Sequence, residues 1–244
     1  MVADRIYAIG DVHGRADLLR ALLAHIGREA PDGMVIFLGD LIDRGPDSCG
    51  VLDLVAAHLR ANPASRLLLG NHDWFLRELL QGSLDASGLE LWADRYGAAG
   101  ALRSYGISDP ASDWQAARRV VLERHPSHLQ LLAGAEYCVV KGDLCFVHAG
   151  LRPGVPLSQQ SPADMMWIKD AFLDHREPFG HLVVHGHSPT PSGLPEVHSN
   201  RIALDTHAFR SGHLSAAAFD GGALSHFLRT TVSPDGAVGI EHLC

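Results

Sequence analysis

The sequence predicts an α/β protein with a largely parallel sheet, because short apolar strands alternate with helices along its first third. Three apolar runs, at residues 5–10, 34–38 and 66–69, each lead directly into a polar loop. Leucine, isoleucine and valine recur at helical spacing in the two connections, residues 16–26 and 51–59. Strands connected by helices in this way lie parallel, with right-handed crossovers.

The second strand shows the pattern most clearly. Residues 34–38, MVIFL, are too few for a helix of their own, and their branched or large apolar side chains favour a covered strand. The loop at residues 39–45, GDLIDRG, has a glycine at each end, which permits tight backbone geometry. Asp40 and Asp43 offer carboxylates, and Arg44 offers a fork for phosphate. Taken alone, the loop is explained equally well as a solvated acidic turn with one salt bridge.

The three loops are expected to meet, because the carboxyl ends of parallel strands gather at one edge of a sheet, where ligands bind. They would bring together Asp11, His13, Asp40, Asp43, Arg44, Asn71, His72 and Asp73. Carboxylate, imidazole and amide groups are ligands for Mn, Fe, Zn or Mg ions, and a central aspartate can bridge two of them. A dinuclear metal site is the leading interpretation.

Residues 74–125 differ in character and predict a helical insertion, at about residues 74–134, between two site-forming strands. The helical pattern is broken at Gly82-Ser83, Gly97 and Gly106. Four aromatic residues lie along it: Trp92, Tyr96, Tyr105 and Trp114. We expect them to form the core of the insertion rather than to stack on a substrate, and the insertion to cover the site.

The second half adds histidines at strand ends. Residues 135–141 and 144–147 predict an antiparallel pair that ends at His148, and residues 182–184 predict a strand that ends at His185 and His187. Later strands, at residues 201–204, 214–219 and 224–228, are expected to complete a second sheet.

Composition excludes several classes of protein. The 244 residues carry a formal net charge of −8, which argues against a nucleic-acid binder. No leader pattern and no run of about 18 apolar residues occurs, so we expect a cytoplasmic protein without a membrane partner. The cysteines show no CxxC spacing and are expected to be reduced, although Cys138 and Cys145 flank a predicted turn; the four are Cys49, Cys138, Cys145 and Cys244.

Five motifs occur in the order of a known superfamily: GDVHG at 10–14, GDLIDRG at 39–45, GNHD at 70–73, VHAG at 147–150 and HGHSP at 185–189. They resemble the metal-dependent phosphoprotein phosphatases, the calcineurin-like metallophosphoesterase superfamily. Residues 92–106, 148–154, 167–169 and 200–206 resemble its bacterial and phage branch. That branch includes Ser/Thr protein phosphatases and symmetrical diadenosine tetraphosphate hydrolases.

The resemblance implies a single domain over residues 1–244, built as a four-layer sandwich of two mixed β-sheets flanked by helices, with the helical insertion. It also implies two divalent metal ions, with manganese expected first and iron, zinc, nickel or cobalt as alternatives. The first ion would be held by Asp11, His13 and Asp40, and the second by Asp40, Asn71, His148 and His187. His187 is preferred to His185 because the family's ligand is the histidine that follows the glycine.

By the same resemblance, His72 is the catalytic histidine paired with Asp43, and Arg44 binds phosphate together with Asn71 and Lys169. Three positions depart from the family pattern. Asp73 stands where glutamate is usual, Lys169 where the bacterial branch has arginine, and His207 where glycine is usual.

The function implied is hydrolysis of phosphate esters by in-line attack of a metal-bridging hydroxide, with His72 protonating the leaving oxygen. A bacterial-type Ser/Thr protein phosphatase, of single or dual specificity, is the first expectation, acting on a phosphorylated protein or a small phosphate ester. A symmetrical diadenosine tetraphosphate hydrolase is the alternative. A non-catalytic metal-binding module is a remote alternative because every expected ligand is present, and a nuclease is disfavoured by the acidic charge.

Overall fold

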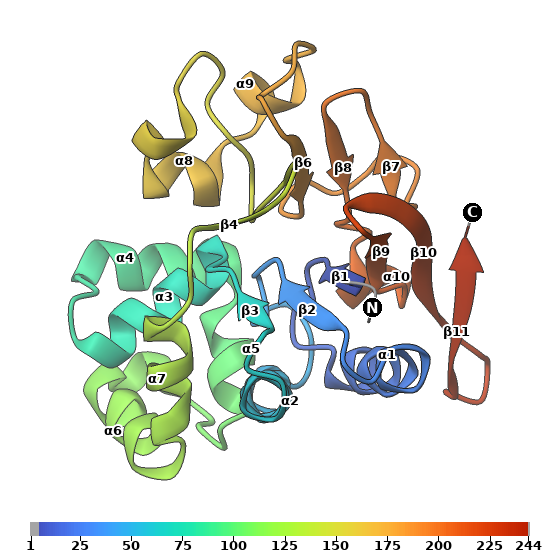
Figure 1. Ribbon diagram of the computed structural model, residues 1–244. Coiled ribbons are helices and arrows are strands. Elements are labelled where there is room, and N and C mark those ends of the chain that lie inside the picture. Colours follow the sequence, from blue (N-terminus) through green and yellow to red (C-terminus); the bar gives the residue numbers. More distant parts are fainter. Residues whose placement is uncertain (1–4, 244) are drawn as a thin grey trace.

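The computed structural model describes residues 5–243, and Figure 1 shows its elements. The strands are β1 (Arg5–Ile9), β2 (Met34–Phe37), β3 (Arg66–Leu67), β4 (Cys138–Lys141), β5 (Leu144–Val147), β6 (Leu182–His185), β7 (Glu196–Val197), β8 (Arg201–Ala203), β9 (Ser215–Asp220), β10 (Ala223–Val232) and β11 (Val238–Leu243). The α-helices are α1 (Ala16–Glu29), α2 (Ser48–Ala61), α3 (Asn71–Gln81), α4 (Ala86–Leu91), α5 (Ala98–Arg103), α6 (Trp114–Arg124), α7 (Pro126–Ala133), α8 (Pro162–Trp167), α9 (Asp170–Leu173) and α10 (Ala208–Ser211). Short helical turns are η1 (Trp92–Tyr96), η2 (Pro110–Ser112) and η3 (Leu157–Gln159).

The strands form two mixed sheets. The first has the order β11-β10-β9-β1-β2-β3, in which β1, β2 and β3 are parallel and the others antiparallel. The second has the order β4-β5-β6-β8-β7, with β5, β6 and β8 parallel between two antiparallel edge strands. The parallel opening of the chain is therefore as predicted.

The placement of the last strands differs from the expectation. Residues 214–219 and 224–228 were expected in the second sheet, but β9 pairs with β1, and β10 follows it in the first sheet. Ala216 and Ala218 of β9 face the core beside α1, whereas Ala217 and Phe219 face the core between the sheets. Because both faces of β9 are covered, its sequence carries no alternation that would reveal its sheet.

Four layers follow from the alternation of side chains along β1. Tyr7 and Ile9 pack with residues of α1 and α2 on the outer face of the first sheet. Ile6 and Ala8 face the second sheet and pack in one core with Phe146. The far side of the second sheet packs against α8 and α9, which lie at the top of Figure 1. The predicted sandwich of two mixed sheets flanked by helices is confirmed.

Helices α3 to α7 lie between β3 and β4 in the chain and gather at the lower left of Figure 1. The predicted breaks are present, because Gly82, Gly97 and Gly106 all adopt positive φ angles, which glycine tolerates. Trp92 is completely buried and its ring stacks parallel to that of Phe75. These aromatic contacts hold the helical segment against the sheet next to the ends of β2 and β3.

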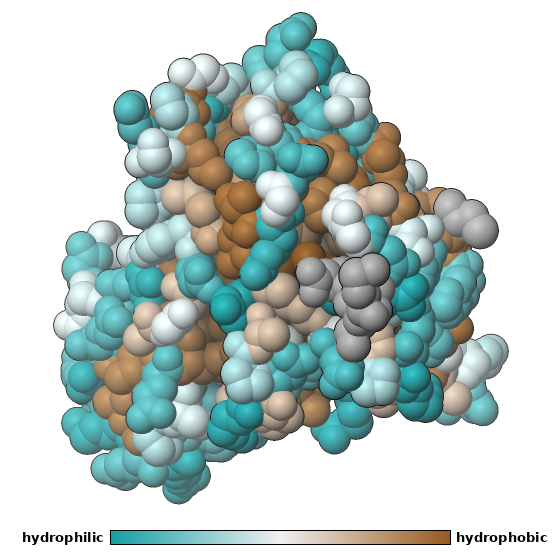
Figure 2. Space-filling model, viewed as in Figure 1, coloured by the Kyte–Doolittle hydropathy of each residue, from teal (hydrophilic) through white to brown (hydrophobic). Residues whose placement is uncertain are grey.

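The surface carries few large apolar side chains. In Figure 2 the hydrophobic residues gather in the centre of the view, around the second sheet, and over the helices at the lower left. The exposed ones among the described residues are Leu91, Val140, Leu194, Val197 and Val232. No described helix is both long enough and apolar enough to cross a membrane.

The described cysteines are free thiols. Cys138 pairs in register with Val147, and Cys145 with Val140, so the two cysteines are not opposite each other in the hairpin. Burial raises the pKa of both Cys49 and Cys145 to about 12. The fourth, Cys244, lies outside the described residues.

Candidate dinuclear metal centre

Polar loops from both sheets converge on one cavity of about 460 Å³. The loops follow β1, β2, β3, β5, β6 and β8, so the parallel strands of each sheet end at the same edge. The cavity is lined by His13, Asp40, Arg44, Asn71, His72, Tyr96, Trp167, Lys169, His187, Pro189, Asp205, His207, Phe209 and Arg210. The predicted convergence of the three amino-terminal loops is present.

Unusual backbone geometry is concentrated at this cavity. The non-glycine residues with positive φ among those described are His13, Asp40, Asp43, Arg44, His187 and His207. All six belong to the loops that form the site. Left-handed conformations cost energy in residues other than glycine and persist where the surrounding structure enforces them. The fold therefore stores strain to direct these side chains into one space.

Two glycines let the loops approach closely. A Cβ atom on Gly70 would lie 2.1 Å from the backbone nitrogen of Asp40, and one on Gly186 would lie 2.0 Å from Asp11 Oδ1. Real Cβ atoms do not approach other atoms so closely, so only glycine fits at both positions.

Asp40 stands at the centre of the cluster. Its Oδ2 lies 3.7 Å from His13 Nε2 and 4.0 Å from His72 Nε2. Its Oδ1 lies 3.4 Å from His148 Nε2 and accepts the backbone N–H of His72 at 3.0 Å. Metal-capable groups form on both sides of it, one with His13 and His72 and the other with His148 and His187. This placement is the one that a bridging carboxylate requires.

In the group of Asp40, His148 and His187, a backbone hydrogen bond orients the ring of His148. His148 Nδ1 lies 2.8 Å from the carbonyl oxygen of Leu38, which fixes the ring and leaves Nε2 facing Asn71 Oδ1 at 3.1 Å. A second hydrogen bond of this kind orients imidazole ligands in metal sites. His187 Nε2 is buried without a hydrogen-bond partner among the described residues. An unpaired nitrogen beside Asp40 and His148 is a coordination position that the protein leaves free.

Asp11 adds a buried carboxylate beside the cavity-lining residue His187. Both of its carboxylate oxygens accept the backbone N–H of His187 at 3.0 Å. Burial raises the pKa of Asp11 well above its usual value, and the nearby carboxylates of Asp205 and Asp40 raise it further. Burial also raises the pKa of Asp205. Buried carboxylates with no lysine or arginine partner among the described residues favour binding of positive ions.

The donor set fits divalent transition metals. Imidazole nitrogens, carboxylates and one amide oxygen surround the cavity, and the grouped ligand atoms lie within 4.8 Å of one another. Four of the six expected ligands belong to these groups: His13, Asp40, His148 and His187. The other two adjoin them, because Asp11 accepts the backbone N–H of His187 and Asn71 Oδ1 lies 3.1 Å from His148 Nε2.

A histidine–aspartate pair, His72 and Asp43, lies beside the expected metal ligands. His72 Nδ1 is 2.6 Å from Asp43 Oδ2, and the same oxygen accepts a hydrogen bond from Trp92 Nε1 at 2.9 Å. Burial lowers the pKa of His72, but the carboxylates of Asp40 and Asp43 outweigh it and the net pKa is raised. His72 Nε2 lies 4.0 Å from Asp40 Oδ2, and the ring lines the cavity.

The contact of Trp92 with Asp43 was not predicted from the sequence. Trp92 was expected to be core, and it is buried, but its indole also fixes Asp43. Tyr96 packs against the core as expected, and it also lines the cavity. Asp205 and Arg210 were not identified; the position of Asp205, directly after the β8 strand, was the available signal.

The residues that depart from the family pattern have defined places. Asp73 accepts the backbone N–H groups of Leu41 and Gly70 at 2.9 and 3.3 Å, so it ties the loop after β2 to the start of α3. His207 lines the cavity. His185 is fully buried against Phe172 and does not line it.

The rim of the cavity is cationic and aromatic. Arg44, Lys169 and Arg210 line it, and the Arg44 side chain is held by the carbonyl oxygen of Arg95 at 2.9 Å. Three aromatic side chains line it as well: Tyr96, Trp167 and Phe209. A rim of this kind attracts phosphate groups and offers flat surfaces to a neighbouring group of the substrate.

Comparison with known proteins agrees with this geometry. The model of the calcineurin-like phosphoesterases matches residues 4–216. The chain belongs to the calcineurin-like phosphoesterase family. Members of this family are hydrolases of phosphoric esters that use a dinuclear centre of divalent metals.

Individual curated relatives match part of the chain. Symmetrical bis(5'-nucleosyl)-tetraphosphatases of Serratia proteamaculans and Yersinia pestis are 42% identical over 76 residues, which is 31% of this chain and 26% and 25% of theirs. The match thus spans about a quarter of the length of these curated relatives.

Solved structures share the fold over nearly the whole chain. A putative diadenosine tetraphosphatase has a TM-score of 0.61 at 20% identity and covers 100% of this chain and 95% of its own. A cold-active protein-tyrosine phosphatase of a Shewanella species has a TM-score of 0.58 at 19% identity, covering 99% and 80%. At these identities the likeness concerns the fold alone.

Proposed function

We propose that this calcineurin-like phosphoesterase is a two-metal phosphomonoesterase that acts on phosphoserine and phosphothreonine in proteins. The observation that carries the proposal is the His72–Asp43 contact of 2.6 Å, facing a cavity that Asp40 and Arg44 also line. A proton donor, a metal-ligand cluster and a phosphate-binding arginine then surround one reacting group.

Six residues would hold the two ions: Asp11, His13, Asp40, Asn71, His148 and His187. When bound, the ions polarise the phosphoryl oxygens and make water a stronger nucleophile. Manganese is the first candidate by resemblance to the family, and the mixed nitrogen and oxygen donors also suit iron, zinc, nickel or cobalt.

The remaining steps belong to side chains. Arg44 binds two phosphoryl oxygens and stabilises the charge that develops on them, while Asn71 and Lys169 provide further contacts at the same cavity. His72 gives its proton to the leaving oxygen. Asp43 holds the imidazole in place through Nδ1, so that Nε2 carries the transferable proton.

Hydrolysis of dinucleoside polyphosphates is the second candidate, favoured by a specific observation. Tyr96, Trp167 and Phe209 line the cavity together with three cationic side chains, and aromatic faces stack on bases. The tetraphosphatases that resemble about a third of the chain, 31%, support the same substrate class.

A substrate comparison tests the proposal. Full-length protein loaded with Mn²⁺ is assayed with a phosphoserine peptide and with diadenosine tetraphosphate, and kcat/KM is measured for each. A higher value for the peptide supports the protein phosphatase, whereas a hundredfold preference for the dinucleotide overturns it. Tyr96→Ala is a useful companion, because loss of a stacking surface should impair the dinucleotide more than p-nitrophenyl phosphate.

A further inference from the structure

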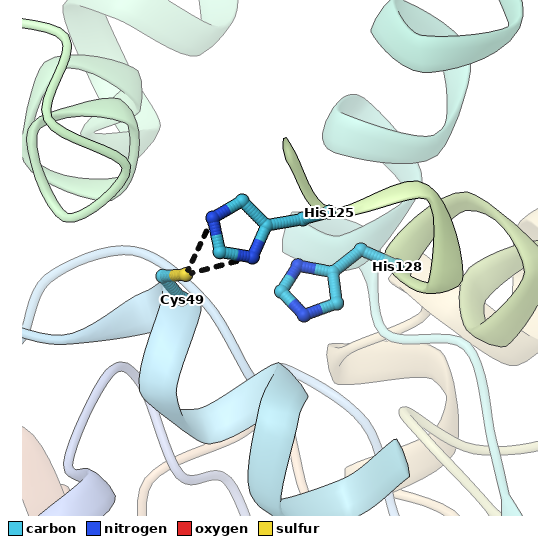
Figure 3. A group of neighbouring side chains, drawn as sticks. All are labelled: Cys49, His125 and His128. Atoms are coloured by element: carbon cyan, nitrogen blue, oxygen red, sulfur yellow. Dashed lines mark hydrogen bonds between the residues drawn. The ribbon is translucent and has the colours of Figure 1, made fainter. Parts of the chain in front are cut away.

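Two groups of metal-capable side chains lie outside the catalytic centre in the described part of the chain. The first is Cys49, His125 and His128, shown in Figure 3. Cys49 Sγ lies 3.6 Å from His125 Nδ1, but both ring nitrogens of His128 are already engaged, with Tyr105 Oη at 2.8 Å and Asp53 Oδ1 at 3.0 Å. This group satisfies itself with internal hydrogen bonds.

The second group is different. We propose that His25 and Glu29 of α1, together with His242 of β11, form a separate binding site for a transition-metal ion of the Zn²⁺ type. Glu29 contacts Arg5, the first residue of β1, whereas the catalytic loops follow the other end of that strand. The two sites are therefore at opposite edges of the first sheet.

The distances between the ligand atoms suit a tetrahedral ion. His25 Nε2 lies 3.2 Å from His242 Nε2 and 3.3 Å from Glu29 Oε2, and all three atoms are within 4.8 Å of one another. Zinc bonds of about 2.0–2.2 Å at tetrahedral angles separate neighbouring ligand atoms by roughly 3.3–3.5 Å. His25 and Glu29 are four residues apart on α1, which places both on one face of the helix.

The carboxylate of Glu29 is oriented as metal ligands are. Its Oε1 accepts hydrogen bonds from Arg5 Nη1 and from Tyr7 Oη, both at 3.0 Å. Its Oε2, which faces His25, is buried and has no hydrogen-bond partner among the described residues. Contacts that fix one oxygen and leave the other free are what ligating carboxylates show in metal sites.

His226 of β10 contacts two of the three proposed ligands, His242 and Glu29. Its ring stacks on that of His242, with centroids 5.0 Å apart and an interplanar angle of 22°. Its Nε2 lies 3.3 Å from Glu29 Oε1 and is also buried without a hydrogen-bond partner among the described residues. His226 is thus a positioning residue for His242, beside a site that takes three ligands from the protein and a water molecule.

An ion at this place would connect α1 to β11, the outermost strand of the first sheet, which pairs only with β10 among the described strands. Edge strands separate from a sheet more readily than central ones. Binding of Zn²⁺ should therefore slow amide hydrogen exchange in β11 while leaving the catalytic loops unchanged.

Metal binding by full-length variants tests the proposal. Zinc per chain is measured by equilibrium dialysis and elemental analysis for wild type, His25→Gln and His242→Gln, with His125→Gln as the matched control from the group in Figure 3. We expect both His25→Gln and His242→Gln to bind one ion fewer than wild type, and His125→Gln to bind the same number. Equal zinc content in wild type and His25→Gln overturns the proposal.

Cobalt spectroscopy separates this site from the catalytic one. An Asp40→Asn/His148→Ala protein lacks catalytic ligands, so strong visible absorption of bound Co²⁺ would report four-coordinate metal at the second site. The absorption should disappear when His242→Gln is added. Its absence from the parent double variant counts against the second site whatever the outcome of the phosphatase assays, and Mn²⁺-dependent turnover of His25→Gln should equal that of wild type.

Discussion

At the scale of single residues, Asp40 is the side chain on which the site depends most. Both of its oxygens lie within about 4 Å of imidazole nitrogens from different loops. Asp40→Asn keeps the shape and removes the negative charge, so we expect loss of bound Mn²⁺ and of nearly all activity toward p-nitrophenyl phosphate. Elemental analysis of the variant decides the matter, because full metal occupancy is incompatible with a bridging role.

His72 is expected to donate a proton to the leaving group and not to bind a metal ion. His72→Asn should retain both ions but lower kcat by about 10²–10⁴-fold, the range typical of one acid–base group. The loss should be smaller for p-nitrophenyl phosphate, whose leaving group needs no proton, than for an alkyl phosphate. Equal losses with the two substrates would exclude proton donation by His72.

Trp92 acts on His72 indirectly, because it donates a hydrogen bond to Asp43, which contacts the His72 ring. Trp92→Phe keeps an aromatic ring beside Phe75 but removes the N–H donated to Asp43 at 2.9 Å. A hydrogen bond to a charged group contributes roughly 1.5–3 kcal/mol, so kcat should fall about 10–100-fold, again less for p-nitrophenyl phosphate. Trp114→Phe is the control, since Trp114 stacks on Trp92 and has no hydrogen bond to Asp43 among its described contacts. Similar losses in both variants would assign Trp92 a packing role only.

At the scale of elements, the junction of β3 and α3 sets the position of the metal ligands. Gly70→Ala would place a methyl group 2.1 Å from the backbone nitrogen of Asp40, where only backbone movement can relieve the clash. We expect weaker Mn²⁺ binding although every ligand is still present. Gly27→Ala, in the last turn of α1 with open space around it, should instead stabilise the protein by about 0.5–1 kcal/mol. Dialysis and thermal melts of the two variants measure the contrast, and unchanged metal affinity in Gly70→Ala would contradict it.

The strands that were predicted well from the sequence are those followed directly by a polar functional motif. β1, β2 and β3 were located to within one or two residues because an apolar run stops at a polar motif in each case. β7, with two residues, and β11, whose side chains are mostly half-exposed, gave no comparable signal and were missed. The contact of Trp92 with Asp43 spans 49 residues, and no local pattern specifies such a pairing.

At the scale of the whole molecule, the metal ions are expected to contribute to stability. Buried carboxylates such as Asp11, Asp40 and Asp205 repel one another until cations offset their charge. A ligand at 100 times its Kd stabilises the folded state by about 2.7 kcal/mol per site, which for a chain of this size corresponds to a Tm increase of roughly 5–11 °C. Melting scans with and without Mn²⁺ measure it, and the increase should be absent in Asp40→Asn.

The pairing of β1 with β9 has a consequence for synthesis. The amino-terminal third leaves the ribosome first, but β1 has no neighbour on one of its edges until residues 215–220 arrive. At about 5–20 residues per second, the delay is roughly 10–40 s. During that time the nascent chain presents an apolar strand with unpaired backbone groups, the structure from which intermolecular pairing begins. A chain stalled on the ribosome before residue 215 would therefore be prone to aggregation. Chaperones that bind nascent chains would be expected to bind at β1.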